Sequence, residues 1–143
     1  SFYLSPKDCH HVFMPTDGQI QAITHIPGNL YPVSPLLSSI FPHAFTQNER
    51  VVITCRTNEV TWYVVFIGAL NVGKMHIHCC PECQTNCSQT KVTQYSGGFA
   101  LKKGDPLGYF EMGSSIIVIH PELDTSPLQS FQDKHVNYGE KLI

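Results

Sequence analysis

Two apolar stretches near the centre of the chain, residues 51–56 and 60–67, restrict the fold most strongly. Both are rich in β-branched and aromatic residues, which favour strands. Residues 57–59 between them, Thr-Asn-Glu, are typical of a hairpin turn. Residues 19–26 alternate between polar and apolar side chains, as a half-buried strand does. No stretch keeps a helical period, so these short segments predict an all-β protein.

The remaining segments extend this prediction along the chain. We expect further strands at residues 2–4, 71–78 and 116–119, and a turn at 102–106 between short strands. Residues 34–47 predict a loop with one short helix, 79–98 a long loop, and 136–143 a closing turn and strand. The expected fold is a partly closed barrel or sandwich of short, mainly antiparallel strands with few short helices, formed by one domain over residues 1–143.

Charge and composition limit the partners of such a domain. Charged residues make up 14% of the 143 residues, well below the ~25% of typical domains, which suits a chain that meets a membrane, a partner or a missing segment of itself. The net charge of −2 and the lack of a basic run argue against nucleic-acid binding. The longest apolar run, residues 60–70, is too short to cross a bilayer. The strand-like start at Ser1 leads us to expect a longer precursor.

One peptide bond, Gly113-Ser114, offers unusual chemistry at the start of the apolar run 116–119. Glycine presents an unhindered carbonyl, and serine places a hydroxyl beside it. If the fold brings the Ser114 hydroxyl onto the Gly113 carbonyl, the amide can rearrange to an ester, and β-elimination would leave a pyruvoyl group on a new N-terminus. The alternative is an ordinary tight turn that leads into a strand.

Five sequence blocks carry a family resemblance, in order and at matching spacing. They are YLSPKDCHHVFMP (3–15), PGNLYPV (27–33), NERV (48–51), GALNVG (68–73) and KGDPLGYFEMGSS (103–115). With these blocks the chain resembles the C-terminal part of the phosphatidylserine decarboxylases, the pyruvoyl-dependent enzymes of phosphatidylethanolamine synthesis. The resemblance implies self-cleavage at Gly113-Ser114 and a pyruvoyl cofactor made from Ser114. It also matches Asp8 and His10 to family site residues, with His10 associated with the decarboxylation step.

The same resemblance implies partners and a location. The substrate would be phosphatidylserine at a membrane surface, either the mitochondrial inner membrane or a bacterial inner membrane. The chain's own upstream or cleaved segment and a second copy, in a homodimer, are further expected partners. Leu36, Leu37, Ile40 and Phe41 could touch lipid, but we expect them to pack in the core.

The chain departs from the family at Phe13, where a second histidine is expected three residues after the first. That histidine would draw the proton from the serine hydroxyl, and phenylalanine cannot. His11 shares a face with Phe13 on a regular strand and is one candidate replacement; an exposed histidine without that role is the other interpretation. Two hypotheses therefore stand: an active pyruvoyl decarboxylase, or a non-processing relative that acts as a lipid-headgroup-binding or regulatory domain.

The cysteines form a second group of candidate residues. Four of the six cysteines fall within residues 79–87, after the histidines at 76 and 78. The donor types suit zinc, but the crowded spacing differs from the two separated pairs of common zinc modules. The resemblance predicts no metal here, and zinc, a local disulfide and free thiols remain alternatives.

Overall fold

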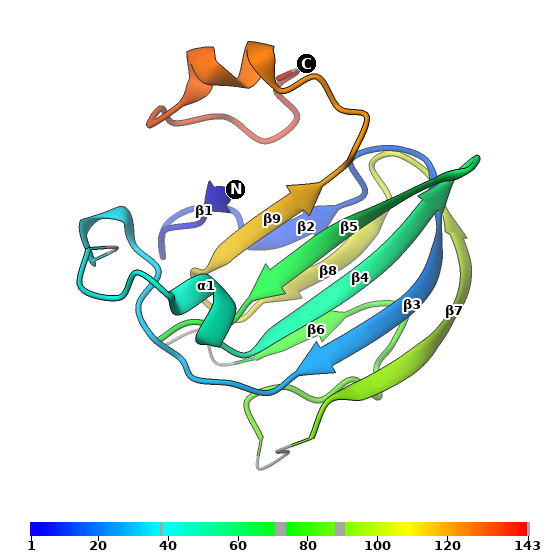
Figure 1. Ribbon diagram of the computed structural model, residues 1–143, viewed down its shortest axis with the longest axis horizontal. Helices are drawn as coiled ribbons and strands as arrows, with labels where there is room; N and C mark the ends of the chain where they lie inside the picture. Colours follow the sequence, from blue (N-terminus) through cyan, green and yellow to red (C-terminus); the bar gives the residue numbers. More distant parts are fainter. Residues whose placement is uncertain (38, 71–73, 88–90, 143) are drawn as a thin grey trace.

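Two antiparallel sheets pack face to face in the computed structural model, which describes residues 1–37, 39–70, 74–87 and 91–142 (Figure 1). The larger sheet has the strand order β1-β9-β5-β4-β3-β7. Its strands are β1 (Phe2–Tyr3), β9 (Ser115–Ile119), β5 (Val60–Ile67), β4 (Arg50–Thr57), β3 (Gly18–Ile26) and β7 (Thr93–Leu101). The smaller sheet has the order β2-β8-β6, with β2 (His11–Phe13), β8 (Pro106–Phe110) and β6 (Met75–Ile77).

The hairpin β4–β5 forms the centre of the larger sheet. Cys55 pairs with Trp62 and Val51 with Phe66, and Asn58 closes the turn at a φ of 54°, a left-handed conformation that asparagine tolerates. Alternate residues of β4 are fully buried, because successive side chains of a strand point to opposite faces. The hairpin thus directs one apolar row into the space between the sheets.

The core lies between the two sheets. The rings of Phe66 on β5 and Phe110 on β8 have centroids 5.1 Å apart, and Leu107 and Met75 are almost completely buried beside them. A Cβ on Gly108 would lie 2.3 Å from the His76 carbonyl oxygen, so β8 and β6 can approach this closely only because position 108 is glycine. Burial of these apolar side chains is the main force that holds the sheets together.

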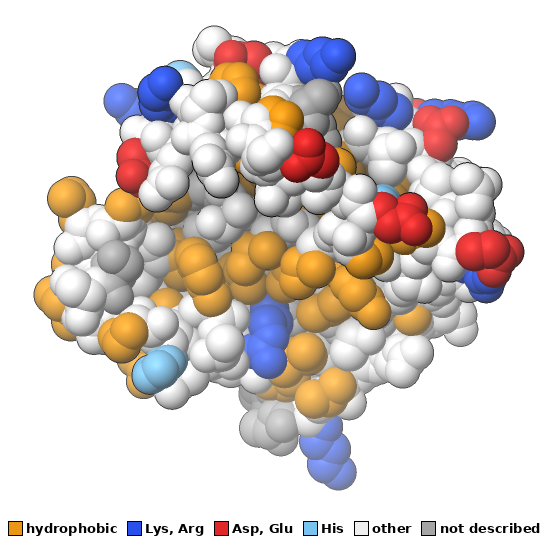
Figure 2. Space-filling view, turned by 45° about the horizontal axis from the view of Figure 1, so that its top comes forward, with side chains coloured by type: hydrophobic (Ala, Val, Ile, Leu, Met, Phe, Trp, Pro, Cys, Tyr) orange, Lys and Arg blue, Asp and Glu red, His pale blue; other side chains and the backbone are white. Residues whose placement is uncertain are grey.

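The outer face of the larger sheet is also partly apolar. Val52, Val65 and Ile117 form one outward row across β4, β5 and β9, and Tyr63 and Ile119 are exposed beside it. Figure 2 shows hydrophobic side chains as a band across this side of the molecule.

Short helical turns and a long C-terminal segment complete the chain. They are the 3-10 turns η1 (Pro35–Leu37) and η2 (Ser126–Phe131) and the single-turn helix α1 (Ala44–Gln47). After β9 the chain passes back over the β1 end of the molecule (Figure 1), and the ring of Tyr138 lies 4.8 Å from that of Phe13. Among the described residues, no helix has the length and apolar content needed to cross a bilayer.

The sandwich predicted from the sequence is confirmed, and the two sheets do not close into a barrel. The hairpin and the short helix within 34–47 are also as predicted. The strand expected at 71–78 covers only Met75–Ile77 among its described residues, and 71–73 lie outside the described parts.

Three predictions from the sequence are wrong. The loop predicted over 79–98 ends early, because Thr93–Leu101 forms β7; as an edge strand with little burial it lacks the apolar alternation that identifies a strand. Residues 136–142 form a turn, with the Glu140 amide donating to Asn137, and no strand; residue 143 is outside the described parts. Leu36 and Ile40 are exposed, not in the core, since the loop that carries them projects from the sheets.

Candidate active site

The bond between Gly113 and Ser114 lies where the chain crosses from one sheet to the other. The smaller sheet ends at Phe110 and the larger sheet resumes at Ser115, so residues 111–114 form the corner. Ser114 is completely buried, and its hydroxyl donates to the carbonyl oxygen of Ile67 on β5. Its own carbonyl oxygen accepts a hydrogen bond from the Leu4 amide at 2.7 Å. The serine is therefore held from both sides and shielded from water.

Backbone atoms of the N-terminal segment lie directly against Gly113. A Cβ at this position would lie 2.5 Å from the Leu4 carbonyl oxygen and 3.0 Å from the Pro6 nitrogen. Both neighbours are backbone atoms, which cannot rotate aside. Close approach, and not an unusual backbone angle, is the reason that only glycine fits at this bond.

Asp8 fixes the segment that covers the bond. Its carboxylate accepts two hydrogen bonds from Ser5, one from the amide and one from the hydroxyl, each at 2.8 Å. These bonds lower the pKa of Asp8, because they stabilise the ionised carboxylate. Asp8 is thus a carboxylate at neutral pH that holds Ser5 beside Gly113.

His10 contributes a buried ring nitrogen, Nε2, to the same neighbourhood. Its Nδ1 lies 2.5 Å from the Asp8 carbonyl oxygen, and because a carbonyl can only accept, Nδ1 must carry the proton of that bond. Its Nε2 is buried and has no hydrogen-bond partner among the described residues. The His10 carbonyl accepts from the Phe110 amide at 3.1 Å, three residues before Gly113. The fold thus brings Asp8, His10, Gly113 and Ser114 into one neighbourhood.

His11 and Phe13 point to a different place. The pairing of β2 with β8 is irregular between Val12 and Phe13, yet the rings of His11 and Phe13 stay 6.5 Å apart on one side. The His11 ring stacks on Tyr109 with centroids 5.3 Å apart, and Phe13 contacts Tyr138. The hydrogen bonds found within the described residues include none between His11 and Ser114. The proposed replacement base is exposed and oriented toward Tyr109.

Comparison with known proteins assigns the family. A family model described as phosphatidylserine decarboxylase matches residues 1–143. The chain belongs to the phosphatidylserine decarboxylase family. The phosphatidylserine decarboxylase proenzyme of Helicobacter pylori (strain ATCC 700392 / 26695) is 36% identical over 145 residues, which cover 99% of this chain and 53% of that protein. That of Campylobacter jejuni is 36% identical over 144 residues, with the same coverage, and that of Coxiella burnetii (strain Dugway 5J108-111) is 31% identical over 142 residues, 98% of this chain and 50% of that protein.

The family assignment confirms the resemblance inferred from the sequence blocks. The chain spans about half the length of the curated relatives that it matches. The activity of the full-length relatives is therefore only a proposal for this chain.

A row of histidines beside the candidate site was not predicted as a group. His76 and Tyr109 have ring centroids 4.5 Å apart, His78 and Tyr109 5.8 Å, and His76 also contacts Glu111 at 2.9 Å. His11, Tyr109 and His76 are paired across β2, β8 and β6. The alternate spacing of His76 and His78 is the one signal in the sequence that could have placed them on one face.

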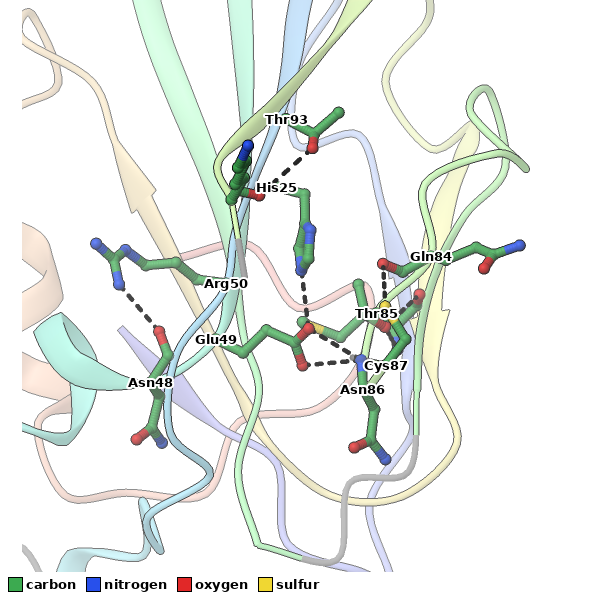
Figure 3. A network of polar contacts seen from close by, with 11 residues as sticks. His25, Asn48, Glu49, Arg50, Gln84, Thr85, Asn86, Cys87 and Thr93 are labelled. Atoms are coloured by element: carbon green, nitrogen blue, oxygen red, sulfur yellow. Dashed lines mark hydrogen bonds and ion pairs between the residues drawn. The ribbon is translucent and has the colours of Figure 1, made fainter. Parts of the chain in front are cut away.

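A buried polar network, also missed, anchors the cysteine-containing loop (Figure 3). Glu49 contacts His25 Nε2 at 2.8 Å and accepts the Asn86 amide on both carboxylate oxygens, at 2.9 and 3.0 Å. The Thr85 hydroxyl accepts from the Met75 amide at 2.8 Å. These contacts hold the loop on the sheet. The available signal was the position of His25, two residues after Ile23, in the row of β3 that points into the core.

The cysteines are free thiols in the structure. Burial raises the pKa of Cys80 to about 12 and that of Cys83 to about 11, so both stay protonated at neutral pH. They line, with His76 and His78, a cavity of about 200 Å³. Within the described parts of the chain, no three His, Cys, Asp or Glu side chains are grouped so that they could hold a metal ion. Of the three alternatives, this arrangement favours free thiols.

Proposed function

We propose that this chain cleaves itself between Gly113 and Ser114, and that the pyruvoyl group so formed serves the decarboxylation of phosphatidylserine to phosphatidylethanolamine. The observation that carries the proposal is the closed corner itself. A fully buried serine follows a glycine that tolerates no side chain, and the segment packed on that glycine carries Asp8 and His10. Membership of the decarboxylase family supports the same assignment.

The cleavage would use the residues of the corner. Ser114 Oγ gives up its hydrogen bond to Ile67 and attacks the Gly113 carbonyl carbon. The carbon–nitrogen bond between the two residues breaks, and the proton of the hydroxyl ends on the released Ser114 nitrogen. The product is an ester at Ser114 with a free amine. Loss of the Ser114 Cα proton then breaks the Cβ–Oγ bond, which releases Gly113 as a carboxylate and leaves a dehydroalanine. This enamine tautomerises to an imine, and one water molecule hydrolyses the imine to the pyruvoyl group and ammonia. Exclusion of water by the Leu4–Pro6 backbone protects the ester from hydrolysis.

The residues around Ser114 fit a pyruvoyl group in this place. Such a group supplies a carbonyl that accepts the electrons released when CO₂ leaves the substrate. His10 would return the proton to the substrate carbon through Nε2, the buried nitrogen with no partner among the described residues. Asp8 acts as a positioning residue, since its carbonyl holds His10 Nδ1 and its carboxylate holds Ser5.

A non-processing relative that binds lipid headgroups is the second candidate. Two observations favour it: Phe13 replaces the expected base, and the Ser114 hydroxyl is engaged with Ile67. General-base assistance typically contributes about 10²–10⁴-fold, so its loss could leave the chain uncut. Either form would meet phosphatidylserine at a mitochondrial or bacterial inner membrane.

An intact-mass spectrum of the denatured protein separates the two candidates. Processing predicts two fragments split after Gly113, with the C-terminal one lighter by one ammonia than a chain that starts with serine. Ser114→Ala is the control and should give one mass. If wild type is cut, His11→Ala tests the replacement base, because unchanged cutting would end that idea.

The second readout is CO₂ release from carboxyl-labelled phosphatidylserine, which the active form predicts for wild type and not for Ser114→Ala. A single wild-type mass without CO₂ release would refute the active form. In that case the restored base in Phe13→His should raise the rate of cutting by about 10²–10⁴-fold, so that fragments become detectable. If this variant also stays whole, the corner does not support processing at all.

A further inference from the structure

One long uncharged stretch exposes large apolar side chains. Residues 27–48 contain no Asp, Glu, Lys or Arg. Leu36 is 90% exposed, Ile40 64% and Phe45 40%; we call these three residues the apolar tip. Leu36 and Ile40 lie on the loop that projects from the body beside α1, and Phe45 lies in α1 itself (Figure 1). Hydrophobic side chains gather at that edge in Figure 2, at the lower left. Exposure on this scale is unfavourable in water and indicates a contact surface.

Several backbone amides of the loop that bears the tip are paired within the loop. The Ile40 and Phe41 amides donate to Leu37, each at 3.0 Å, the Ala44 amide to Phe41 at 3.1 Å and the Gln47 amide to His43 at 2.9 Å. Prolines at 32, 35 and 42 carry no amide proton. Each paired amide lowers the cost of moving the loop toward a non-polar phase, because an unpaired backbone group is costly there.

Hydrogen bonds of a buried side chain hold the base of the loop in place, so the exposure of the tip is part of the fold. Asn48 is completely buried; its side chain accepts from the Tyr31 amide at 3.0 Å and donates to the Tyr31 and Gly68 carbonyls, each at 2.8 Å. The rings of Tyr31 and Phe41 stack with centroids 5.1 Å apart. The two ends of the loop are thereby joined to each other and to Gly68, directly after β5, and the tip cannot fold back onto the sheets without breaking these contacts.

The same end of β5 holds the candidate reactive serine. Gly68, which accepts from Asn48, directly follows Ile67, which accepts from Ser114. β9 begins beside α1 at this end of the sheet (Figure 1). The base of the loop and the Gly113-Ser114 corner are thus bonded to consecutive residues, Gly68 and Ile67, at the end of β5.

We propose that the apolar tip inserts into the interface of a phospholipid bilayer and holds the Gly113-Ser114 corner at the level of the lipid headgroups. A segment without charged side chains, and with several backbone amides already paired, can enter the interface without the cost of burying a charge. A second copy of the chain fits less well, because three side chains are far fewer than the ~20–30 residues a side of a stable protein interface. Insertion of the tip into a bilayer does not depend on the proposed function. Only its role, which is to hold the reactive corner at the headgroups, rests on the proposed function.

Tryptophan quenching by lipid provides a direct test. The only native tryptophan, Trp62, is completely buried and serves as an internal reference. We expect Leu36→Trp to show quenching by phosphatidylcholine vesicles with brominated acyl chains. Phe99→Trp, at a 41% exposed apolar position on β7 at the opposite edge of the sheet, is the matched control and should stay unquenched. No quenching at position 36, or equal quenching at both positions, would overturn the proposal.

A second measurement separates lipid from other occupants. Leu36→Ser combined with Ile40→Ser should weaken co-sedimentation with phosphatidylcholine vesicles at least about tenfold, because two apolar side chains no longer leave water. Sedimentation velocity without lipid should be unchanged in this double variant; a lipid-free dimer that the variant abolishes would assign the tip to a second copy and refute the proposal.

The outcome is distinguishable from a failure of the proposed function. Ser114→Ala cannot form the pyruvoyl group, yet it should bind vesicles as wild type does. Vesicle binding by the wild type without CO₂ release would support membrane insertion of the tip and refute the proposed decarboxylase activity. The opposite outcome would be CO₂ release from phosphatidylserine in detergent micelles with unaltered vesicle binding by the double variant. It would refute membrane insertion of the tip and leave the decarboxylase activity supported.

Discussion

The substitution Gly113→Ala tests the packing on which the candidate active site depends. The new Cβ would lie 2.5 Å from the Leu4 carbonyl oxygen, about 0.9 Å short of ordinary contact, which begins near 3.4 Å. It would also meet the Pro6 nitrogen at 3.0 Å. Because the obstacles are backbone atoms, relief requires that the N-terminal segment move as a unit.

The cost follows from what holds that segment. β1 pairs with β9 only through Phe2 with Ile116 and Tyr3 with Ser115, and Leu4 adds one amide bond to Ser114. Each hydrogen bond is worth about 0.5–1.5 kcal/mol net, so detachment loses roughly 2–3 kcal/mol. Retaining the contact under strain costs about 1–3 kcal/mol. Both routes predict that the free energy of unfolding falls by about 2 kcal/mol.

Urea unfolding followed by the fluorescence of Trp62 measures this loss, on chains that an intact mass shows to be uncut. With a typical slope of ~2 kcal/mol/M, the midpoint should move down by about 1 M. Ser115→Ala is the control, since the Ser115 hydroxyl is buried without a partner among the described residues, and its removal should be neutral or stabilising. A loss below about 0.5 kcal/mol for Gly113→Ala would refute the close packing of Leu4 on the corner.

Three further predictions concern the surroundings of the site. Asn48→Ala should lower the free energy of unfolding by about 3 kcal/mol, because three backbone groups lose their buried partner; urea unfolding measures it. In the native protein iodoacetamide should modify the exposed Cys9 and leave the buried Cys80, whose pKa is raised to about 12, unmodified until urea unfolds the chain, as counted by mass. Asp8 should stabilise the fold above its unfolded pKa of ~3.9, and this contribution should fade as pH drops through its lowered folded pKa; Asp8→Asn should therefore flatten the acid limb of a stability profile between pH 2 and 7.

Each of these has an outcome that would contradict it. Asn137→Ala, at an exposed position, is the matched control for Asn48→Ala, and equal losses would deny the buried role. Rapid native alkylation of Cys80 would contradict its burial. An unchanged acid limb in Asp8→Asn would show that the Ser5 hydrogen bonds do not depress the pKa of Asp8.

Much of the fold could be predicted because local patterns and tertiary structure agree there. The β4–β5 hairpin is encoded by alternation, β-branched residues and a turn with an asparagine that tolerates positive φ. Prediction failed where the exposure of a residue differs from what its side-chain type suggests. β7 is an edge strand whose polar residues resemble those of a loop, and Leu36 is an apolar residue exposed on a projecting loop. In both cases burial, which depends on neighbours distant in the sequence, decided the outcome.

The candidate site shows the same division. The sequence by itself determined the family, the Gly113-Ser114 bond and the residue types at positions 8, 10 and 13, because these are carried by short blocks of adjacent residues. Only the tertiary structure decided that Leu4 lies against Gly113 and that Ser114 is buried against Ile67. It also decided that the base of the loop bearing the apolar tip is bonded beside this corner, at Gly68. These are contacts between segments far apart in the chain, and their distances arise from the packing of two sheets that no local pattern specifies.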